Sequence, residues 1–170
     1  AAPKQTTPAF VQYAERAVNV YLGVIGMGLA WFYHGGALRL SYHGLGEIAV
    51  LLAYGPLVVC GTYLVQAGQV TATLIHLSMI LGLLVAAFLW INQFPDYLAD
   101  KSADKRNLVV RIGREKAALT YVVIIATAYL WLSLVAYFYL ESRGAAWGLS
   151  GLPLAIFSAW RLLDSPENTP

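Results

Sequence analysis

The sequence predicts an all-α, polytopic membrane protein with about five transmembrane helices. Of its 170 residues, 59% are hydrophobic and 12% are charged, whereas a soluble domain carries about twice that charged fraction. The mean hydropathy is +0.62. Asp, Glu, Lys and Arg are absent from four long intervals, residues 17–38, 48–95, 117–140 and 144–160. Since a spanning helix requires roughly 20 apolar residues, these intervals supply the membrane segments.

The expected elements follow in order within a single transmembrane domain, residues 1–170. Residues 1–15 contain Pro and Thr and are expected to form a flexible N-terminal segment. The first span covers about 17–35 and ends in aromatic residues that suit a membrane interface. The interval 48–95 is long enough for two spans, about 48–65 and 70–91, and Gly55-Pro56 interrupts the earlier one. The last two spans cover about 117–140 and 146–163.

The distribution of basic residues predicts the orientation. From Asp96 to Lys116 the chain carries four acids and six bases. With five spans, this loop, the loop at 36–46 and the C-terminus share one face. Basic loops face the cytoplasm, so we expect an outside N-terminus, a cytoplasmic C-terminus and a bacterial-type inner membrane.

Three aspartates in the charged loop recur every four residues, at Asp96, Asp100 and Asp104. On a helix they would form one stripe, in which like charges repel unless a cation lies among them. Mg²⁺ is a candidate, because it favours one or two carboxylates together with phosphate oxygens. Asp104 would be a further ligand. The alternative is an ordinary helix start at Pro95 with surface ion pairs.

A second charged loop, with Arg39, His43 and Glu47, is expected on the same face. Acids and bases at the mouth of a helical bundle suit a ligand that is anionic at one end and apolar at the other. An isoprenoid diphosphate fits, because Mg²⁺ and basic side chains would neutralise the diphosphate while the chain lies between helices. Nothing in the sequence matches a phosphate loop, a zinc spacing or a nucleic-acid motif, so no nucleic-acid partner is expected.

These residues also resemble a known family. Asn92-x3-Asp96-x3-Asp100, followed by Lys105-x-Asn107-Leu-Val-Val-Arg111-Ile-Gly113, is similar to the second aspartate-rich motif of the UbiA superfamily of intramembrane aromatic prenyltransferases and the segment that trails it. Three further segments resemble the branch of this superfamily that prenylates dihydroxynaphthoate. They are Tyr42-His-Gly44-Leu45-Gly46-Glu47, Gly55-Pro56 and Gly61-Thr-Tyr63-Leu-Val-Gln66-Ala-Gly68. The chain looks like the C-terminal half of such an enzyme.

The resemblance implies roles for residues at matching positions. Asp96 and Asp100 match the catalytic acids that bind Mg²⁺ and the diphosphate. Candidate substrate-binding residues at or beside family positions are Asn92, Lys105, Arg111 and Glu47, and Arg39 joins them from the same charged face. The implied reaction transfers a polyprenyl group from its diphosphate to an aromatic ring carbon, as in quinone biosynthesis.

Departures from the family leave a second interpretation open. The first aspartate-rich motif of the family, Asn-Asp-x-x-Asp, does not occur in these 170 residues, and Asp104 stands where the family usually has Gly. The alternative is a non-catalytic integral membrane subunit of a larger electron-transfer or photosynthetic complex, derived from a prenyltransferase and holding quinone, pigment or lipid. His34 and His76 would then be the natural axial ligands of a pigment. In both cases we expect membrane lipid and another membrane chain or a larger complex as partners.

Overall fold

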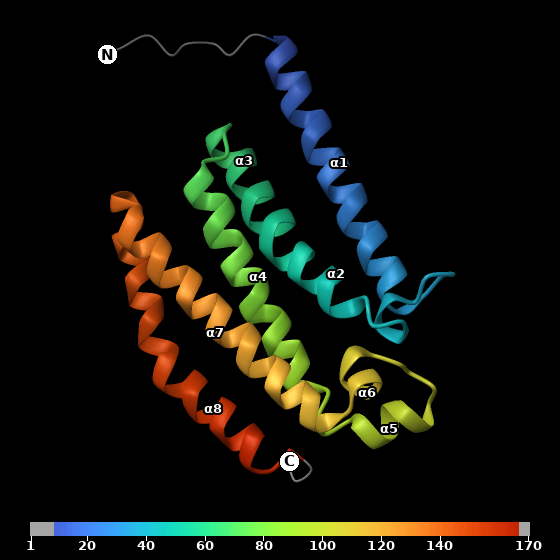
Figure 1. The fold of residues 1–170 in the computed structure, drawn as a ribbon. Coiled ribbons are helices and arrows are strands. Elements are labelled where there is room, and N and C mark those ends of the chain that lie inside the picture. The colour runs from blue at the N-terminus through green and yellow to red at the C-terminus, as the bar shows by residue number, and fades with distance from the viewer. Residues whose placement is uncertain (1–8, 167–170) are drawn as a thin grey trace.

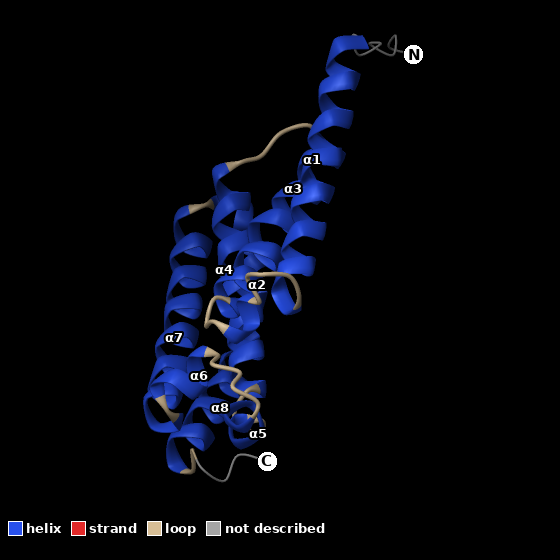
Figure 2. Ribbon diagram, turned by 90° about the vertical axis from the view of Figure 1, so that its right-hand side faces the viewer, coloured by secondary structure: helices blue, strands red, loops and turns tan. Residues whose placement is uncertain are grey.

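The computed structural model describes residues 9–166, and for residues 9–16 and 140–143 it describes the backbone alone. Every regular element within this range is helical (Figure 2). The all-α class is therefore confirmed. Of the segment expected to be flexible, residues 1–8 lie outside the described residues, and the first helix begins at Ala9.

The long helices lie in a row in which neighbours along the chain are mostly neighbours in space (Figure 1). In chain order the elements are α1 (Ala9–His34), the 3₁₀ turn η1 (Leu40–Tyr42), α2 (Gly46–Leu52), the π-helical η2 (Ala53–Cys60), α3 (Gly61–Ala67), α4 (Ala72–Asn92), α5 (Tyr97–Ser102), α6 (Leu108–Ile112), α7 (Arg114–Phe138), the 3₁₀ helix η3 (Leu140–Gly151) and α8 (Leu152–Asp164). Helix α4 packs against α2 and η2 on one side and against α7 on the other.

Within residues 9–166, 4 helices are long and apolar enough to cross a membrane: Ala17–His34, Gly46–Ala67, Ala72–Asn92 and Arg114–Phe138. The polytopic helical bundle is therefore confirmed. The segment expected as a fifth span, 146–163, is instead divided between η3 and the 13 residues of α8. Although η3 and α8 together return the chain from the end of α7 to the end with the charged loops (Figure 1), α8 alone, at about 1.5 Å per residue, is shorter than the hydrocarbon core of a bilayer. The physical reason is that Gly144, Gly148 and Gly151 disfavour α-helix and Pro153 favours a new helix start.

The interruption expected at Gly55-Pro56 takes the form of the π-helical η2, so α2, η2 and α3 form one continuous span of 22 residues. Pro56 cannot donate a backbone hydrogen bond, and a π-helical segment is one way to accommodate it. At Gly55, an added Cβ would lie 2.6 Å from the Ser78 carbonyl oxygen and 3.1 Å from the Gly82 Cα. The two spans approach closely here because both helices present glycine.

The main core joins α4, α6, α7 and α8 at the end of the bundle that carries the charged loop. Its largest buried members include Trp90, Phe94, Val109, Tyr121 and Leu162. The indole N–H of Trp90 donates a hydrogen bond to the Ala117 carbonyl oxygen at 3.0 Å, which satisfies a buried donor. This core holds the ends of α4 and α7, and therefore the loop between them, in fixed positions.

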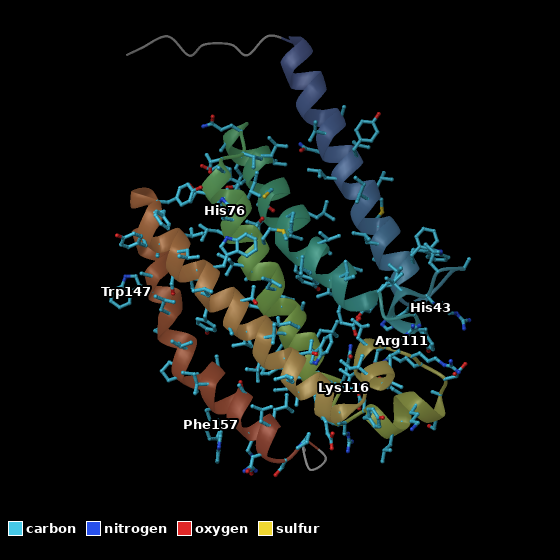
Figure 3. All side chains as sticks on the ribbon, viewed as in Figure 1. His43, His76, Arg111, Lys116, Trp147 and Phe157 are labelled. Carbon is cyan, nitrogen blue, oxygen red and sulfur yellow. The ribbon has the colours of Figure 1, made fainter. Side chains whose placement is uncertain are left out.

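The two charged loops lie at the same end of the bundle as the end of α8, and the connection from α3 to α4 lies at the opposite end (Figure 1). Arg111 and Lys116 lie toward the first end, whereas His76 lies toward the second (Figure 3). The sequence predicts this grouping of loops. Which end faces the cytoplasm stays a prediction.

Candidate functional site

The carboxylate of Asp100 organises the charged loop. The residue as a whole is 8% exposed, and the Lys105 ammonium donates to both carboxylate oxygens at 3.0 Å. The side-chain N–H of Asn107 donates to Oδ2 at 2.7 Å. The side-chain oxygen of Asn107, Oδ1, in turn accepts the Val110 N–H at 2.8 Å and caps α6. These hydrogen bonds of Asp100 therefore hold residues 100–107 in a compact turn.

The three aspartates do not form the expected stripe. Helix α5 ends at Ser102, and Asp104 adopts the left-handed conformation with φ 53°, so its side chain leaves the helical repeat. Asp104 is paired with the Arg106 Nε at 2.9 Å on an exposed surface, while Asp96 is exposed at the start of α5. Among the described residues, no group of three His, Cys, Asp or Glu side chains is placed to hold a metal ion.

A polar pocket of about 300 Å³ lies where the end of α1, the start of α2 and the end of α4 meet. It brings together four of the residues that the sequence singles out, namely Glu47, Asn92, Asp96 and Lys105. The other lining residues are Tyr33, His34, Ser41, Gly46, Leu89 and Gln93. One face of this pocket is therefore acidic and rich in oxygen acceptors, and Lys105 supplies a cation beside it.

A larger apolar pocket of about 730 Å³ adjoins the polar one. Tyr33, Leu89 and Asn92 line both pockets. The remaining lining comes from α1, from the α2–η2 span and from α4, through Gly26, Leu29, Ala30, Ala49, Val50, Ala53, Tyr54, Leu57, Val58, Val85 and Phe88. Its volume is within the range of ligand sites. Together the two pockets offer a polar end and a long apolar end to one ligand.

Glu47 connects three elements at the polar pocket. Its Oε1 accepts the side-chain N–H of Gln93 at 2.9 Å and, more weakly, the backbone N–H of Leu108 at 3.4 Å. Glu47 Oε2 and Gln93 Oε1 are buried and have no hydrogen-bond partner among the residues described. Glu47 is among the candidate residues from the sequence, whereas Gln93 is not. Gln93 directly follows Asn92, but no short motif pairs it with a residue as distant in the sequence as Glu47.

Four of the candidate residues lie outside the polar pocket, and one of them is Asp100, whose carboxylate oxygens are bonded within the loop. Arg111 donates from Nε to the Arg106 carbonyl oxygen at 2.7 Å, and with Asp104 it lines a separate surface hollow. The Arg39 guanidinium lies over the Tyr42 ring at 5.7 Å from the ring centre. These arginines lie at the charged end and add positive potential there, but they are not brought to Asp96.

The two histidines considered as pigment ligands lie on different helices. His34, at the end of α1, lines the polar pocket, and its Nδ1 is 3.2 Å from the Ser41 hydroxyl. His76, on α4, packs against Trp131 and Tyr139 with ring centres 5.8 and 5.6 Å apart. Each ring thus has neighbours within the protein.

Apolar spanning helices with this two-part pocket define an integral membrane protein that is suited to an amphiphilic ligand. More particularly, the chain belongs to the UbiA prenyltransferase family, whose family profile matches residues 15–170. The resemblance to the UbiA superfamily is therefore confirmed.

Relatives with known names agree with this placement. The chain is 32% identical, over 82% of its own length and 47% of the relative's, to the 1,4-dihydroxy-2-naphthoate octaprenyltransferase of Mycobacterium tuberculosis. It is 35% identical to the enzyme of that name from Haemophilus influenzae, over 64% of this chain and 35% of the relative. It is 30% identical to the 2-carboxy-1,4-naphthoquinone phytyltransferase of Synechocystis, over 60% and 33%. The chain thus spans less than half the length of these relatives, and no solved structure gives a significant match.

Proposed function

We propose that this chain forms the diphosphate-binding part of a UbiA-type prenyltransferase, which transfers a polyprenyl group from its diphosphate to an aromatic acceptor in quinone or related biosynthesis. The observation that carries the proposal is that the polar and apolar pockets share the lining residues Tyr33, Leu89 and Asn92. The names of the relatives support a naphthalene-type acceptor. Because the chain spans less than half of their length, further acidic ligands would come from another segment or chain.

The donor atoms in the polar pocket fit Mg²⁺. Asp96 offers an exposed carboxylate and Asn92 an amide oxygen, and Mg²⁺ prefers such oxygen ligands together with substrate phosphates. Asp96 and Asn92 would hold the ion, which when bound neutralises the diphosphate and helps it to leave. Asp100 does not line this pocket, since both of its oxygens are bonded within the loop.

Lys105 is placed to bind the diphosphate. An ammonium carries three N–H donors, and two of them are directed at the Asp100 oxygens. The third is left for a phosphate oxygen in the pocket that Lys105 lines. Asp100 and Asn107 fix the ammonium at this edge, so Asp100 acts as a positioning residue and Lys105 as a binding residue.

The apolar pocket would take the prenyl chain and keep water from the reacting carbon. The Tyr33 ring lines both pockets, at the boundary where the first carbon of the chain would meet the diphosphate. An aromatic face at that point stabilises a developing allylic cation by cation–π attraction. Burial of each methylene group contributes about 0.8 kcal/mol to binding.

The test is binding of a prenyl thiodiphosphate, which resists cleavage, to the purified chain in detergent with and without Mg²⁺. We expect Asp96→Asn to abolish the effect of Mg²⁺ and Lys105→Met to weaken binding about tenfold or more. Asp104→Asn is the matched control, because this exposed carboxylate lies outside the pocket. Equal, Mg²⁺-dependent binding to all of these variants would contradict the proposal.

A second candidate function is the non-catalytic subunit of an electron-transfer or photosynthetic complex, holding quinone, pigment or lipid in the apolar pocket. It is favoured by the full pairing of Asp100, which leaves Asp96 as the one exposed aspartate of the pocket. Purification in mild detergent separates the two. A co-purifying chain with an Asn-Asp-x-x-Asp motif supports the enzyme, and a large redox assembly supports the subunit. In both cases we propose an inner-membrane location with the charged loop cytoplasmic.

A further inference from the structure

Two residues that line the polar pocket, Glu47 and Gln93, each carry a buried side-chain oxygen, Oε2 and Oε1, without a hydrogen-bond partner among residues 9–166. The two residues are 5% and 7% exposed. A buried acceptor without a donor loses the hydrogen bond that it would make in water, which destabilises the protein until a donor is supplied. The two residues are also joined to each other through the Gln93 N–H at 2.9 Å, so their remaining oxygens act as one unit.

The chemistry of this pair selects its ligand. Both free atoms are acceptors and one belongs to a carboxylate, so a phosphate oxygen placed against them would be repelled. The diphosphate is therefore directed to Lys105, which also lines this pocket. What the pair lacks is a hydrogen-bond donor or a cation.

A hydroxyl fits better than a metal ion at this pair. Mg²⁺ requires near-octahedral oxygen ligation, whereas the pair presents one carboxylate and one amide, with the Gln93 N–H already directed at the carboxylate. Asp100, a neighbouring acid, is fully bonded within the loop. A neutral O–H donor satisfies an acceptor oxygen without needing further ligands.

We propose that the Glu47–Gln93 pair binds a ring hydroxyl of the aromatic acceptor. This inference rests on the proposed function and assigns its second substrate to atoms of this chain. The pair then holds the acceptor ring in the same pocket as Lys105 and beside Tyr33, which lines the boundary to the apolar pocket. A carboxylate that accepts this hydrogen bond also draws the hydroxyl proton toward itself, which raises the electron density of the ring.

The experiment compares two probes that differ in donor capacity, 1,4-dihydroxy-2-naphthoate and its 1,4-dimethoxy counterpart. Binding to the full chain in detergent is measured anaerobically and in EDTA. We expect the dihydroxy compound to bind at least about tenfold more tightly, because the methoxy groups cannot donate. In Gln93→Met and in Glu47→Gln this preference is lost. The control Gln66→Met, on the exposed end of α3, retains it.

Glu47 also accepts the Leu108 N–H, so a loss of binding in Glu47→Gln could come from altered folding. Gln93→Met lacks this complication, and the thiodiphosphate probe shows whether the diphosphate site of each variant is still intact. Gln93→Met is expected to bind the thiodiphosphate as the unaltered chain does. Equal binding of the two naphthoates, no binding of the dihydroxy compound, or an unchanged preference in Gln93→Met would each overturn the inference. So would binding of Mg²⁺ alone that is lost in Gln93→Met.

The same measurements separate this inference from the function on which it rests. If thiodiphosphate binding depends on Asp96 and Lys105 while the naphthoates bind equally, the hydroxyl site is wrong and the diphosphate site stands. If the naphthoate preference depends on Gln93 while thiodiphosphate binding ignores Asp96 and Lys105, the proposed function fails.

Discussion

Replacement of Asp100 by Asn should loosen the charged loop without directly removing a group from the pocket. The carboxylate accepts the Lys105 ammonium at both oxygens and the Asn107 amide at one. An asparagine keeps one acceptor oxygen and turns an N–H₂ group toward these donors. The remaining ammonium is partly buried, with its side chain 24% exposed, so it loses its counter-charge while it is only partly solvated.

The magnitude follows from these contacts. A hydrogen bond to a charged group contributes about 1.5–3 kcal/mol, and breaking a fully buried ion pair costs about 3–5 kcal/mol. Because the side chains of this pair are 24% and 12% exposed, solvent screening lowers the loss, and we expect about 2 kcal/mol. That corresponds to about 30-fold more frequent local opening of the loop.

Hydrogen–deuterium exchange of the loop measures this opening. The Lys105 N–H is bonded to the Asp100 carbonyl oxygen at 2.9 Å and the Val110 N–H to the Asn107 side chain at 2.8 Å, so both amides report on the same unit. In Asp100→Asn they should exchange about 30-fold faster. Asp96→Asn is the matched control and should leave them unchanged. Equal rates in Asp100→Asn and the unaltered chain would refute the reasoning.

Two further substitutions test the packing that carries the site. Gly55→Ala should lower the thermal unfolding temperature by an amount corresponding to about 1–3 kcal/mol, since its Cβ would lie 2.6 Å from the Ser78 carbonyl oxygen. The control is Gly23→Ala, which should not lower this temperature, because an added Cβ there meets no neighbouring side chain or helix within 4 Å. Trp90→Phe leaves the Ala117 carbonyl without its indole donor and should lower stability by about 1–3 kcal/mol in the same assay, and an unchanged midpoint would show that this bond is dispensable.

The sequence predicted the spans that can be recognised as long intervals without charged residues. Residues 48–95 contain no Asp, Glu, Lys or Arg, and the structure forms two spanning helices there. The final segment was harder, because hydropathy does not register backbone preference. Gly148 and Gly151 carry little polarity, yet they favour the tighter turn of η3 and leave α8 short.

For the candidate site, the sequence predicted only what depends on the spacing of residues close together in the chain. Asp96 and Asp100 are four residues apart, and this suggested one shared surface. In the structure only Asp96 lines the polar pocket, whereas Asp100 is bonded to Lys105 and to Asn107, seven residues further along the chain. The pairing of Glu47 with Gln93 depends on the packing of α2 against α4, which a single sequence does not encode in any short motif.

The arrangement of charges indicates that the loop between α4 and α7 has a structural role in addition to the proposed role of its side chains in binding. A loop whose acids all faced the pocket would repel itself and lose order until an ion arrived. Here Asp100 is neutralised by Lys105 and by Asn107, so the loop has a fixed shape of its own. The exposed Asp96 is then presented to a ligand from an ordered loop. Preorganisation of this kind reduces the ordering entropy that binding would otherwise require.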